Sequence, residues 1–226
     1  MKYKNLTLLG TSHIAQQSLD QVKESIEKIK PGIVALELDK NRLFALISGK
    51  RRKPTLRDVR AIGLKGYVLN MIGAYIEKRL GKMVGVKPGS EMVLAFNLAK
   101  KNKLKVALVD QDVSITLKKL SKALTFKEKF NFFVDLFKGL ILRKKEIDFD
   151  LTKVPTEKVI KDMMVKVKDR YPNFYKVLVV DRNKFMARKL AGLMSYYPDS
   201  QILAIVGAGH TKEIISLTKN FYEKHL

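Results

Sequence analysis

The sequence predicts an α/β fold in which a mostly parallel central sheet is flanked by helices. Four short apolar runs are typical of buried strands, and segments with helical periodicity separate them along the chain. The strand candidates cover residues 6–10, 33–39, 105–110 and 202–207. Alternating strands and helices favour parallel pairing, because each helix returns the chain to the starting edge of the sheet.

The first strand, helix and strand form the clearest unit. After "LTLLG" (6–10), the segment "SLDQVKESIEKIKPG" places one apolar face at Leu19, Val22, Ile26 and Ile29. Ser18 and Gln21 have the spacing of a capping box at the start of this helix, and "KPG" ends it. The run "IVALELD" (33–39) then returns as a strand, with Ala35, Glu37 and Asp39 on one face.

Two helical insertions interrupt the alternation, at about residues 50–85 and 118–175. The first contains the basic stretch "GKRRKPTLRDVR", and the helix "SEMVLAFNLAKKN" then leads into the third strand. The second contains "TFKEKFNFFVDLFKGLILRKK" before the chain reaches the fourth strand. No low-complexity linker divides the chain. We therefore predict one domain, residues 1–226, with the insertions forming a lid or subdomain.

Composition excludes several classes of protein. With 226 residues, 46% of them hydrophobic, the chain can bury a sizeable core. The absence of cysteine excludes disulfides, thiolate metal sites and a cysteine nucleophile. No Gly-x-Ser-x-Gly, Walker or His-Glu-x-x-His motif is present. Because no apolar run approaches 18 residues, we expect a cytoplasmic protein, or the soluble part of a longer membrane protein.

Polar residues follow the strand candidates at their carboxyl ends, where a parallel sheet opens onto a crevice. They are His13, Glu37, Asp39, Asp110, Asp112 and His210. The two histidines end matching Gly-x-x-His sequences, which begin at Gly10 and Gly207. We expect each glycine to permit a tight exit from its strand. Ser12 and Gly209 would leave the imidazoles uncrowded, whereas His225 is expected at the surface.

Two imidazoles and a carboxylate without sulfur suit Zn, Mn, Co or Fe. Three protein ligands and an open position are typical of a catalytic metal, which lowers the pKa of bound water to about 7. The candidate ligands are His13, Glu37 and His210. Asp110 or Glu91 would be a further ligand or general base, and Arg42 would anchor the substrate.

These residues also have structural interpretations. A histidine after a strand commonly makes a structural hydrogen bond, and Glu37 would lie on the exposed face of an edge strand. Asp110 would cap a turn, and the helix dipole favours Glu91 in a first turn. Arg42 would simply pair with Asp39. Both interpretations stay open at this point.

Five stretches, in order, resemble the motifs of the TraB/PrgY family. They are "LLGTSHIAQQSLDQV", "PGIVALELDKNR", "KPGSEMVLAFNLAKKNKLKVALVDQDVSITL", "VVDRNKFMARKL" and "VGAGHTKEI". That family is named after a pheromone-shutdown protein and has many archaeal members. It is similar to the Tiki membrane metalloproteases, and more distantly to ChaN-like and erythromycin-esterase-like proteins.

The resemblance implies a mostly parallel sheet and a Tiki-type site made of two Gly-x-x-His motifs and a glutamate, here His13, His210 and Glu37. It also places Arg182 at a polar position of the pattern, together with Arg42, Glu91, Asp110 and Asp112. Two departures stand out. Gln111 replaces the usual arginine, which bears on substrate recognition. Lys212 and Glu213 stand where a glycine often follows the second histidine.

A formal charge of +23 attracts anionic partners. Lysines crowd the second insertion among phenylalanines at helical spacing, at Phe126, Phe130, Phe133 and Phe137. Such a helix lies on an anionic membrane or covers an apolar ligand, or else its phenylalanines pack into the core. A second basic cluster covers residues 50–53. Nucleic acid is a less favoured partner, because no recognition motif is present. A further interpretation is that the charges are solvated helix faces, as is typical of heat-adapted proteins.

Two functional hypotheses follow. The first is a metal-dependent hydrolase of the TraB/Tiki type that acts on peptides through a metal-held water. The second is a non-catalytic module that binds or sequesters apolar peptides, including at a membrane surface. Turnover that depends on metal supports the first, and stoichiometric binding that survives chelation supports the second. The sequence does not specify the metal, the substrate or the oligomeric state.

Overall fold

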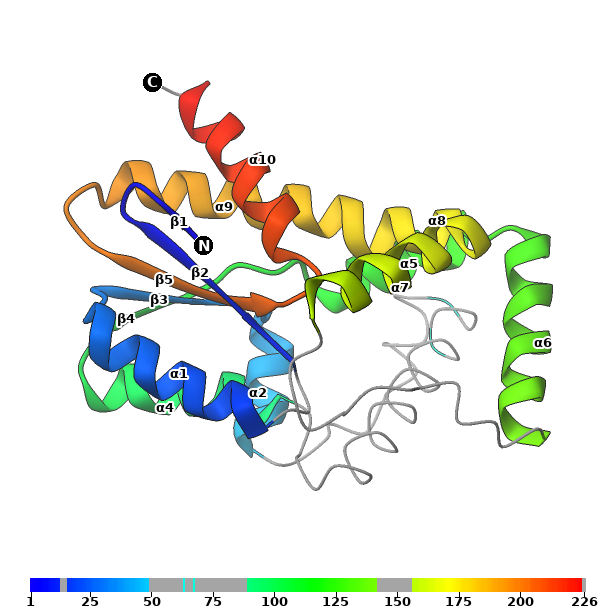
Figure 1. The fold of residues 1–226 in the computed structure, drawn as a ribbon, viewed down its shortest axis with the longest axis horizontal. Coiled ribbons are helices and arrows are strands. Elements are labelled where there is room, and N and C mark those ends of the chain that lie inside the picture. Colours follow the sequence, from blue (N-terminus) through cyan, green and yellow to red (C-terminus); the bar gives the residue numbers. More distant parts are fainter. Residues whose placement is uncertain (13–15, 49–62, 64–66, 68–88, 142–155, 225–226) are drawn as a thin grey trace.

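A five-stranded sheet with helices on both faces forms the centre of the molecule in a computed structural model (Figure 1). The structure describes residues 1–12, 16–48, 63, 67, 89–141 and 156–224. The strands are β1 (Lys2–Tyr3), β2 (Leu6–Thr11), β3 (Ile33–Leu36), β4 (Lys105–Leu108) and β5 (Ile202–Gly207). Their order is β1-β2-β5-β3-β4, and only β1 runs antiparallel to its neighbour. The predicted α/β class is therefore confirmed.

The last strand lies in the middle of the sheet, between β2 and β3. Its register sets Gly207 opposite Thr11 and Ile205 opposite Leu36, and Leu36 is in turn opposite Leu108. All residues of β3 and β5 are buried, as expected for strands covered on both faces. The carboxyl ends of the four parallel strands consequently meet at one edge of the sheet.

Two pairs of helices cover the sheet. One face packs against α1 (Gln16–Ile29) and α4 (Ser90–Lys101), and the other against α9 (Asp181–Tyr196) and α10 (Thr211–Glu223) (Figure 1). Alternate residues of β5 divide between these two cores. Leu203 and Ile205 pack with α1 and α4, whereas Ile202, Ala204 and Val206 pack with α9 and α10.

The strand predicted over 33–39 ends three residues earlier, at Leu36. The N–H of Leu38 donates to the carbonyl of Leu36 (2.7 Å), which turns the chain away from the sheet. Asp39 then accepts from the backbone N–H groups of Asn41 and Arg42, at the start of α2 (Lys40–Ser48). The prediction that Glu37 and Asp39 share a strand face is wrong, because both lie beyond the strand.

The start of the first helix also differs from the prediction. The helix α1 begins at Gln16, so Ser18 lies inside its first turn rather than at its cap. The hydroxyl of Ser18 instead accepts from the backbone N–H of Ser12 (2.9 Å). This serine therefore ties the end of β2 to α1.

The second insertion is helical in the residues that the structure describes. It comprises α5 (Val113–Ala123), α6 (Phe126–Ile141), α7 (Glu157–Arg170), α8 (Pro172–Tyr175) and the π-helical segment η1 (Lys176–Val180), which continues into α9. The first insertion lies outside the described residues, apart from Gly63 and Tyr67. None of the helices described is long and apolar enough to cross a membrane.

The phenylalanines of α6 do not follow the core-packing interpretation throughout. Phe126 is 90% exposed and Phe130 is 69% exposed, so for these two side chains that interpretation is wrong. The side chains of Phe133 and Phe137 lie outside the described part of the structure. Figure 1 places α6 at one end of the molecule, away from the sheet.

A buried glutamate joins α6 to the rest of the molecule. Glu128 is 3% exposed, and its carboxylate accepts from the N–H and hydroxyl of Thr125 (3.0 Å each). It also accepts from the backbone N–H of Asn173 (2.7 Å), at the start of α8. The Arg170 guanidinium holds Asp135 farther along α6, so two carboxylates brace this helix.

We expect Glu128→Gln to lower the free energy of unfolding by about 1–3 kcal/mol near neutral pH, because buried hydrogen bonds to a charged acceptor are lost. Burial raises the pKa of Glu128, but the hydrogen bonds from Thr125 and Asn173 outweigh it and lower the pKa overall. A carboxylate with a lowered pKa stabilises the fold above its unfolded pKa of about 4.3, and this contribution is lost as pH falls through the folded pKa.

Urea unfolding between pH 7 and pH 3 measures the effect. The difference between wild type and Glu128→Gln should shrink as the pH falls. Glu24→Gln is the matched control, because Glu24 forms an exposed pair with Lys28 and should change stability little. A difference for Glu128→Gln that stays constant with pH would contradict the assignment.

Candidate metal and ion-pair site at the sheet edge

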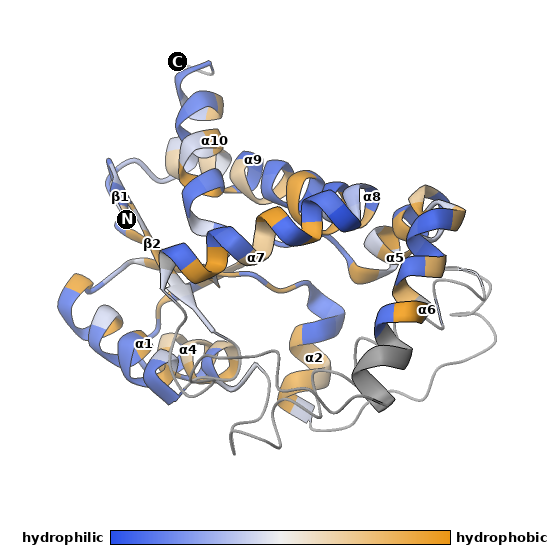
Figure 2. Ribbon diagram, turned by 45° about the vertical axis from the view of Figure 1, so that its right-hand side comes forward, coloured by the Kyte–Doolittle hydropathy of each residue, from blue (hydrophilic) through white to orange (hydrophobic). Residues whose placement is uncertain are grey.

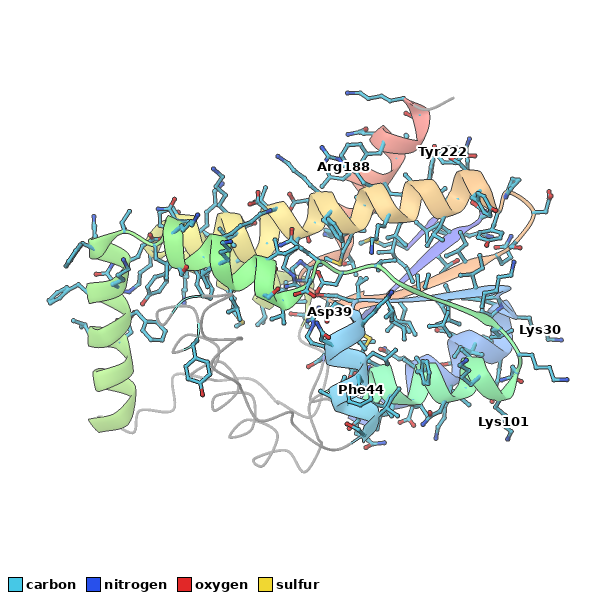
Figure 3. The ribbon with its side chains drawn as sticks, turned by 180° about the vertical axis from the view of Figure 1, so that it is seen from behind. Lys30, Asp39, Phe44, Lys101, Arg188 and Tyr222 are labelled. Carbon is cyan, nitrogen blue, oxygen red and sulfur yellow. The ribbon has the colours of Figure 1, made fainter. Side chains whose placement is uncertain are left out.

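Charged side chains gather where the parallel strands end, around the place marked by Asp39 in Figure 3. Glu37 follows β3, Asp110 follows β4 and His210 follows β5, as the sequence predicted. Two arginines lie among them, Arg42 from α2 and Arg182 from α9. The structure therefore brings three of the predicted site residues and the predicted anchor into one cluster.

Glu37 is held from two sides. Its Oε2 accepts from the backbone N–H of Gly207 (2.6 Å), and its Oε1 accepts from Nη2 of Arg182 (2.6 Å). Its own N–H donates to the carbonyl of Ile205 (3.1 Å). The side chain is only 3% exposed, so the carboxylate is fixed between the end of β5 and the start of α9.

His210 stands at the N-terminal boundary of α10 and contacts Asn183 on α9. Its Nδ1 lies 2.6 Å from Oδ1 of Asn183, whose amide nitrogen donates to Oε2 of Glu213 (2.8 Å). A carboxylate only accepts, so the Asn183 amide group must face Glu213 and its oxygen must face the histidine. This pattern places a proton on Nδ1, so Nε2 is the nitrogen that would bind a metal when the ring is neutral.

The other ring nitrogen of His210 faces the glutamate. Nε2 of His210 lies 3.7 Å from Oε1 of Glu37, which is longer than a hydrogen bond. Both side chains are largely buried. The arrangement places an imidazole nitrogen and a carboxylate oxygen side by side, and Oε1 of the carboxylate also accepts from Arg182.

Asp110 connects the two arginines. It accepts from Nε (3.1 Å) and Nη2 (2.6 Å) of Arg182, and from Nη2 of Arg42. Arg42 also donates from Nε to Asp39 (2.7 Å), so the pairing interpretation of this arginine is confirmed and extends to Asp110. Burial lowers the pKa of Arg182, but the charges of Glu37 and Asp110 raise it overall, and the guanidinium stays charged.

The segment before Arg182 is unusual. The helix runs through the π-helical turn η1 before α9 begins, and π turns are frequent at functional sites. Nη1 of Arg182 donates to the carbonyl of Leu178 within this turn (3.2 Å). Because the same guanidinium also binds Glu37 and Asp110, Arg182 joins the π turn to two strand ends.

Other predicted residues have different surroundings. His13, His225 and the basic cluster at 50–53 lie outside the described residues.

Glu91 is 1% exposed in the first turn of α4, a position that the helix dipole favours. Asp112 caps α5 by accepting from the N–H of Ser114 (2.7 Å). Gln111 is buried and accepts from Nζ of Lys119 (3.2 Å), so a nearby lysine supplies positive charge beside it.

The glycine that begins the first Gly-x-x-His motif, Gly10, is needed for a different reason than expected. Gly63 and Gly89 are the described glycines with positive φ, so Gly10 and Gly207 do not need glycine for their dihedral angles. A Cβ on Gly10 would lie 2.8 Å from Cγ2 of Thr211 and 3.2 Å from Cα of Ala208. Gly10 is therefore required by the close approach of α10 to β2.

Gly209 was expected to leave space beside the imidazole. A Cβ added there would lie 2.7 Å from the terminal methyl of Met164. A side chain from α7 therefore packs against this glycine, and the expected space beside the imidazole stays a prediction.

Two of the three predicted metal ligands, Glu37 and His210, are adjacent. Among the described residues, no group of three or more histidine and carboxylate side chains is arranged to hold a metal. A third ligand would have to come from His13, as the sequence predicted. The net charge of this ion-pair cluster suits a cation. Its three carboxylates (Glu37, Asp39 and Asp110) outnumber its two guanidinium groups (Arg42 and Arg182) by one.

Sequence reasoning missed Asn183, which orients His210. It is fully buried and follows Arg182 directly in the stretch "VVDRNKF". A buried asparagine on an otherwise apolar helical face was the available signal, but its partner is 27 residues away in the sequence. Only the packing of α10 on α9 brings the two side chains together.

Known proteins resemble this chain over nearly its whole length. The model of the TraB/PrgY/gumN family matches residues 2–224. The chain is 35% identical to the uncharacterized protein MJ1365 of Methanocaldococcus jannaschii, over 95% of this chain and 53% of that protein. It is 24% identical to the TraB domain-containing proteins of Mus musculus and Homo sapiens, over 92% of this chain and 61% of each.

The chain spans about half to three fifths of the length of these relatives. The match to the family model covers nearly the whole chain, including both Gly-x-x-His motifs and the stretch that contains Arg182 and Asn183. The chain therefore belongs to the TraB/PrgY/gumN family.

Proposed function

We propose that this protein is a metal-dependent hydrolase that acts on peptides. The observation that carries the proposal is the 3.7 Å separation between Nε2 of His210 and Oε1 of Glu37. Two ligand atoms of one tetrahedral cation, each about 2.1 Å from it, lie about 3.4 Å apart. A small adjustment of either side chain gives that spacing.

The surroundings of the histidine support the same role. A metal-binding histidine usually donates its other ring N–H to an oxygen acceptor, which orients the ring. Asn183 supplies that acceptor, and Glu213 orients Asn183 in turn. His13 would complete the ligand set.

A divalent cation held there would act as a Lewis acid and lower the pKa of water to about 7. Arg182 positions Glu37, and Arg42, whose side chain is 33% exposed, would anchor a carboxylate group of the peptide. Asp110 already accepts from both arginines and from the N–H of Gln111. This saturation argues against Asp110 as the general base.

Metal titration tests the site directly. Wild-type protein stripped of metal would be titrated with Zn, Mn, Co and Fe by calorimetry, and the imidazole nitrogens followed by NMR. With only three histidines in the chain, comparison with His210→Gln assigns the His210 signals. We expect stoichiometric binding in the wild type, a metal-induced shift at Nε2 of His210, and loss of binding in His210→Gln.

Two further variants sharpen the result. Asn183→Leu should weaken metal affinity by about 10-fold to 100-fold, because the orienting partner of the ring is lost. Glu24→Gln removes an exposed carboxylate and should leave affinity unchanged. A folded wild type that binds none of the four metals would overturn the proposal.

A peptide-cleavage screen follows if metal binds. Metal-dependent product formation that disappears in His210→Gln would support the hydrolase. Stoichiometric peptide binding that survives chelation, without cleavage, would instead identify the protein as a peptide-sequestering module.

A further inference from the structure

The start of α6 exposes two phenylalanines on one helical face. Phe126 is 90% exposed, more than any other large hydrophobic side chain in the described ranges, and Phe130 is 69% exposed. Their spacing of four residues places them one turn apart on the same side of the helix. Figure 2 shows hydrophobic and hydrophilic residues side by side on this part of α6.

Lysines flank these phenylalanines along the sequence of α5 and α6. We define the α5–α6 basic face by its members Lys118, Lys119, Lys122, Phe126, Lys127, Lys129 and Phe130. Lys118, Lys119, Lys122 and Lys127 are exposed, and Nζ of Lys129 lies 5.7 Å from the centre of the Phe126 ring. One partly exposed lysine thus lies over an exposed aromatic ring, and the other four are exposed on the same two consecutive helices.

The acidic residues of this stretch do not oppose those lysines. Glu128 is buried and accepts from Thr125 and Asn173, and Asp135 is bound by the Arg170 guanidinium. The same two carboxylates brace α6 against α8 and α7. The helix is therefore held by its polar contacts while the phenylalanines of its first turns point to solvent.

We propose that the α5–α6 basic face docks on an anionic lipid surface. Aromatic side chains enter the boundary between headgroups and acyl chains, while lysines bind the anionic headgroups. Each lysine close to such a surface strengthens binding about fivefold. The charge of the face is complementary to anionic lipid, and its apolar rings are what distinguish it from the solvated lysines elsewhere on this chain. The inference does not depend on the metal site.

Vesicle flotation of the full chain tests the proposal. The vesicles would be phosphatidylcholine alone or phosphatidylcholine with 30% phosphatidylglycerol, at about 0.15 M salt. We expect the wild type to bind the anionic vesicles and not the neutral ones. Lys127→Gln/Lys129→Gln should weaken binding about 25-fold, from two fivefold losses, and Phe126→Ala/Phe130→Ala by at least tenfold.

Matched variants control for net charge and for apolar exposure. Lys100→Gln/Lys101→Gln removes two charges near the end of α4, which lies at the opposite end of the molecule from α6 (Figure 3). Phe44→Ala removes a 68% exposed ring from α2. Both should bind anionic vesicles like the wild type. Unchanged circular dichroism spectra would show that each variant folds.

Three results would overturn the proposal. The first is no binding to anionic vesicles. The second is an equal loss in the α4 and α6 lysine variants, which would mean that net charge alone drives association. The third is a Phe126/Phe130-dependent self-association, or binding of a single-stranded oligonucleotide, without vesicle binding.

Discussion

Arg182→Ala is expected to lower the free energy of unfolding by about 3–5 kcal/mol, the usual effect of removing one partner from a buried ion pair. Arg182 donates to Glu37 and Asp110, whose side chains are 3% and 0% exposed. Without the guanidinium, Glu37 loses its paired cation and Asp110 keeps only Arg42. Equilibrium unfolding in urea would measure the loss.

Two variants separate charge from geometry. Arg182→Lys keeps the positive charge but not the planar group that reaches both carboxylates, so it should recover only part of the stability. Arg188→Ala is the matched control on the same helix. Arg188 is exposed and stacks over the Phe221 ring, so its loss should cost about 1 kcal/mol or less. If Arg182→Ala were no more harmful than this control, the ion-pair cluster would not stabilise the fold.

Gly10→Ala should destabilise the protein by about 1–3 kcal/mol, as expected for an added methyl group in a packed contact. The new Cβ would meet Cγ2 of Thr211 at 2.8 Å and the backbone of Ala208 at 3.2 Å. Neither neighbour is the far end of a flexible side chain, so α10 would have to move away from β2. His210 lies in the turn between β5 and α10, so it should lose its contact with Asn183 when α10 moves.

Two other glycines provide the comparison. A Cβ on Gly192, in α9, meets nothing within 4 Å, so Gly192→Ala should stabilise the helix by about 0.5–1 kcal/mol. Gly209→Ala should be tolerated better than Gly10→Ala, because the Met164 side chain can move. Thermal unfolding of the three variants tests this order. A neutral Gly10→Ala would show that the motif glycine is not required for packing.

Much of the fold follows from local pattern. Apolar runs at β2, β3, β4 and β5 are recognisable because strands buried on both faces need nearly continuous apolar residues. The helix between β2 and β3 is recognisable from its apolar period. Boundaries were less accurate: the strand through Glu37 was predicted too long, because its last residues have strand-like alternation but hydrogen-bond in a turn.

The location of the candidate site could be predicted, but the hydrogen bonds and ion pairs between its side chains could not. Placing functional residues after parallel strands correctly brought Glu37, Asp110 and His210 together. The roles of Arg42 and Arg182 were not determined, since an arginine near a strand end is equally compatible with substrate binding and with an ion pair. Their pairing with Asp110 depends on distances across 68 and 72 residues of sequence.

The sequence by itself determined the α/β class, the family and the edge of the sheet where polar residues collect. These features depend on periodicity, composition and the ends of strands, all of which are local in the chain. The tertiary structure decided which atoms are in contact. Asn183 orients His210, and two arginines bind the buried carboxylates. The absence of a side chain at Gly10 allows α10 to pack close to β2. The reason is physical. The ionisation and hydrogen bonding of buried charges and imidazoles depend on neighbouring side chains from distant segments of the chain. The packing of the helices on the sheet determines which side chains those are.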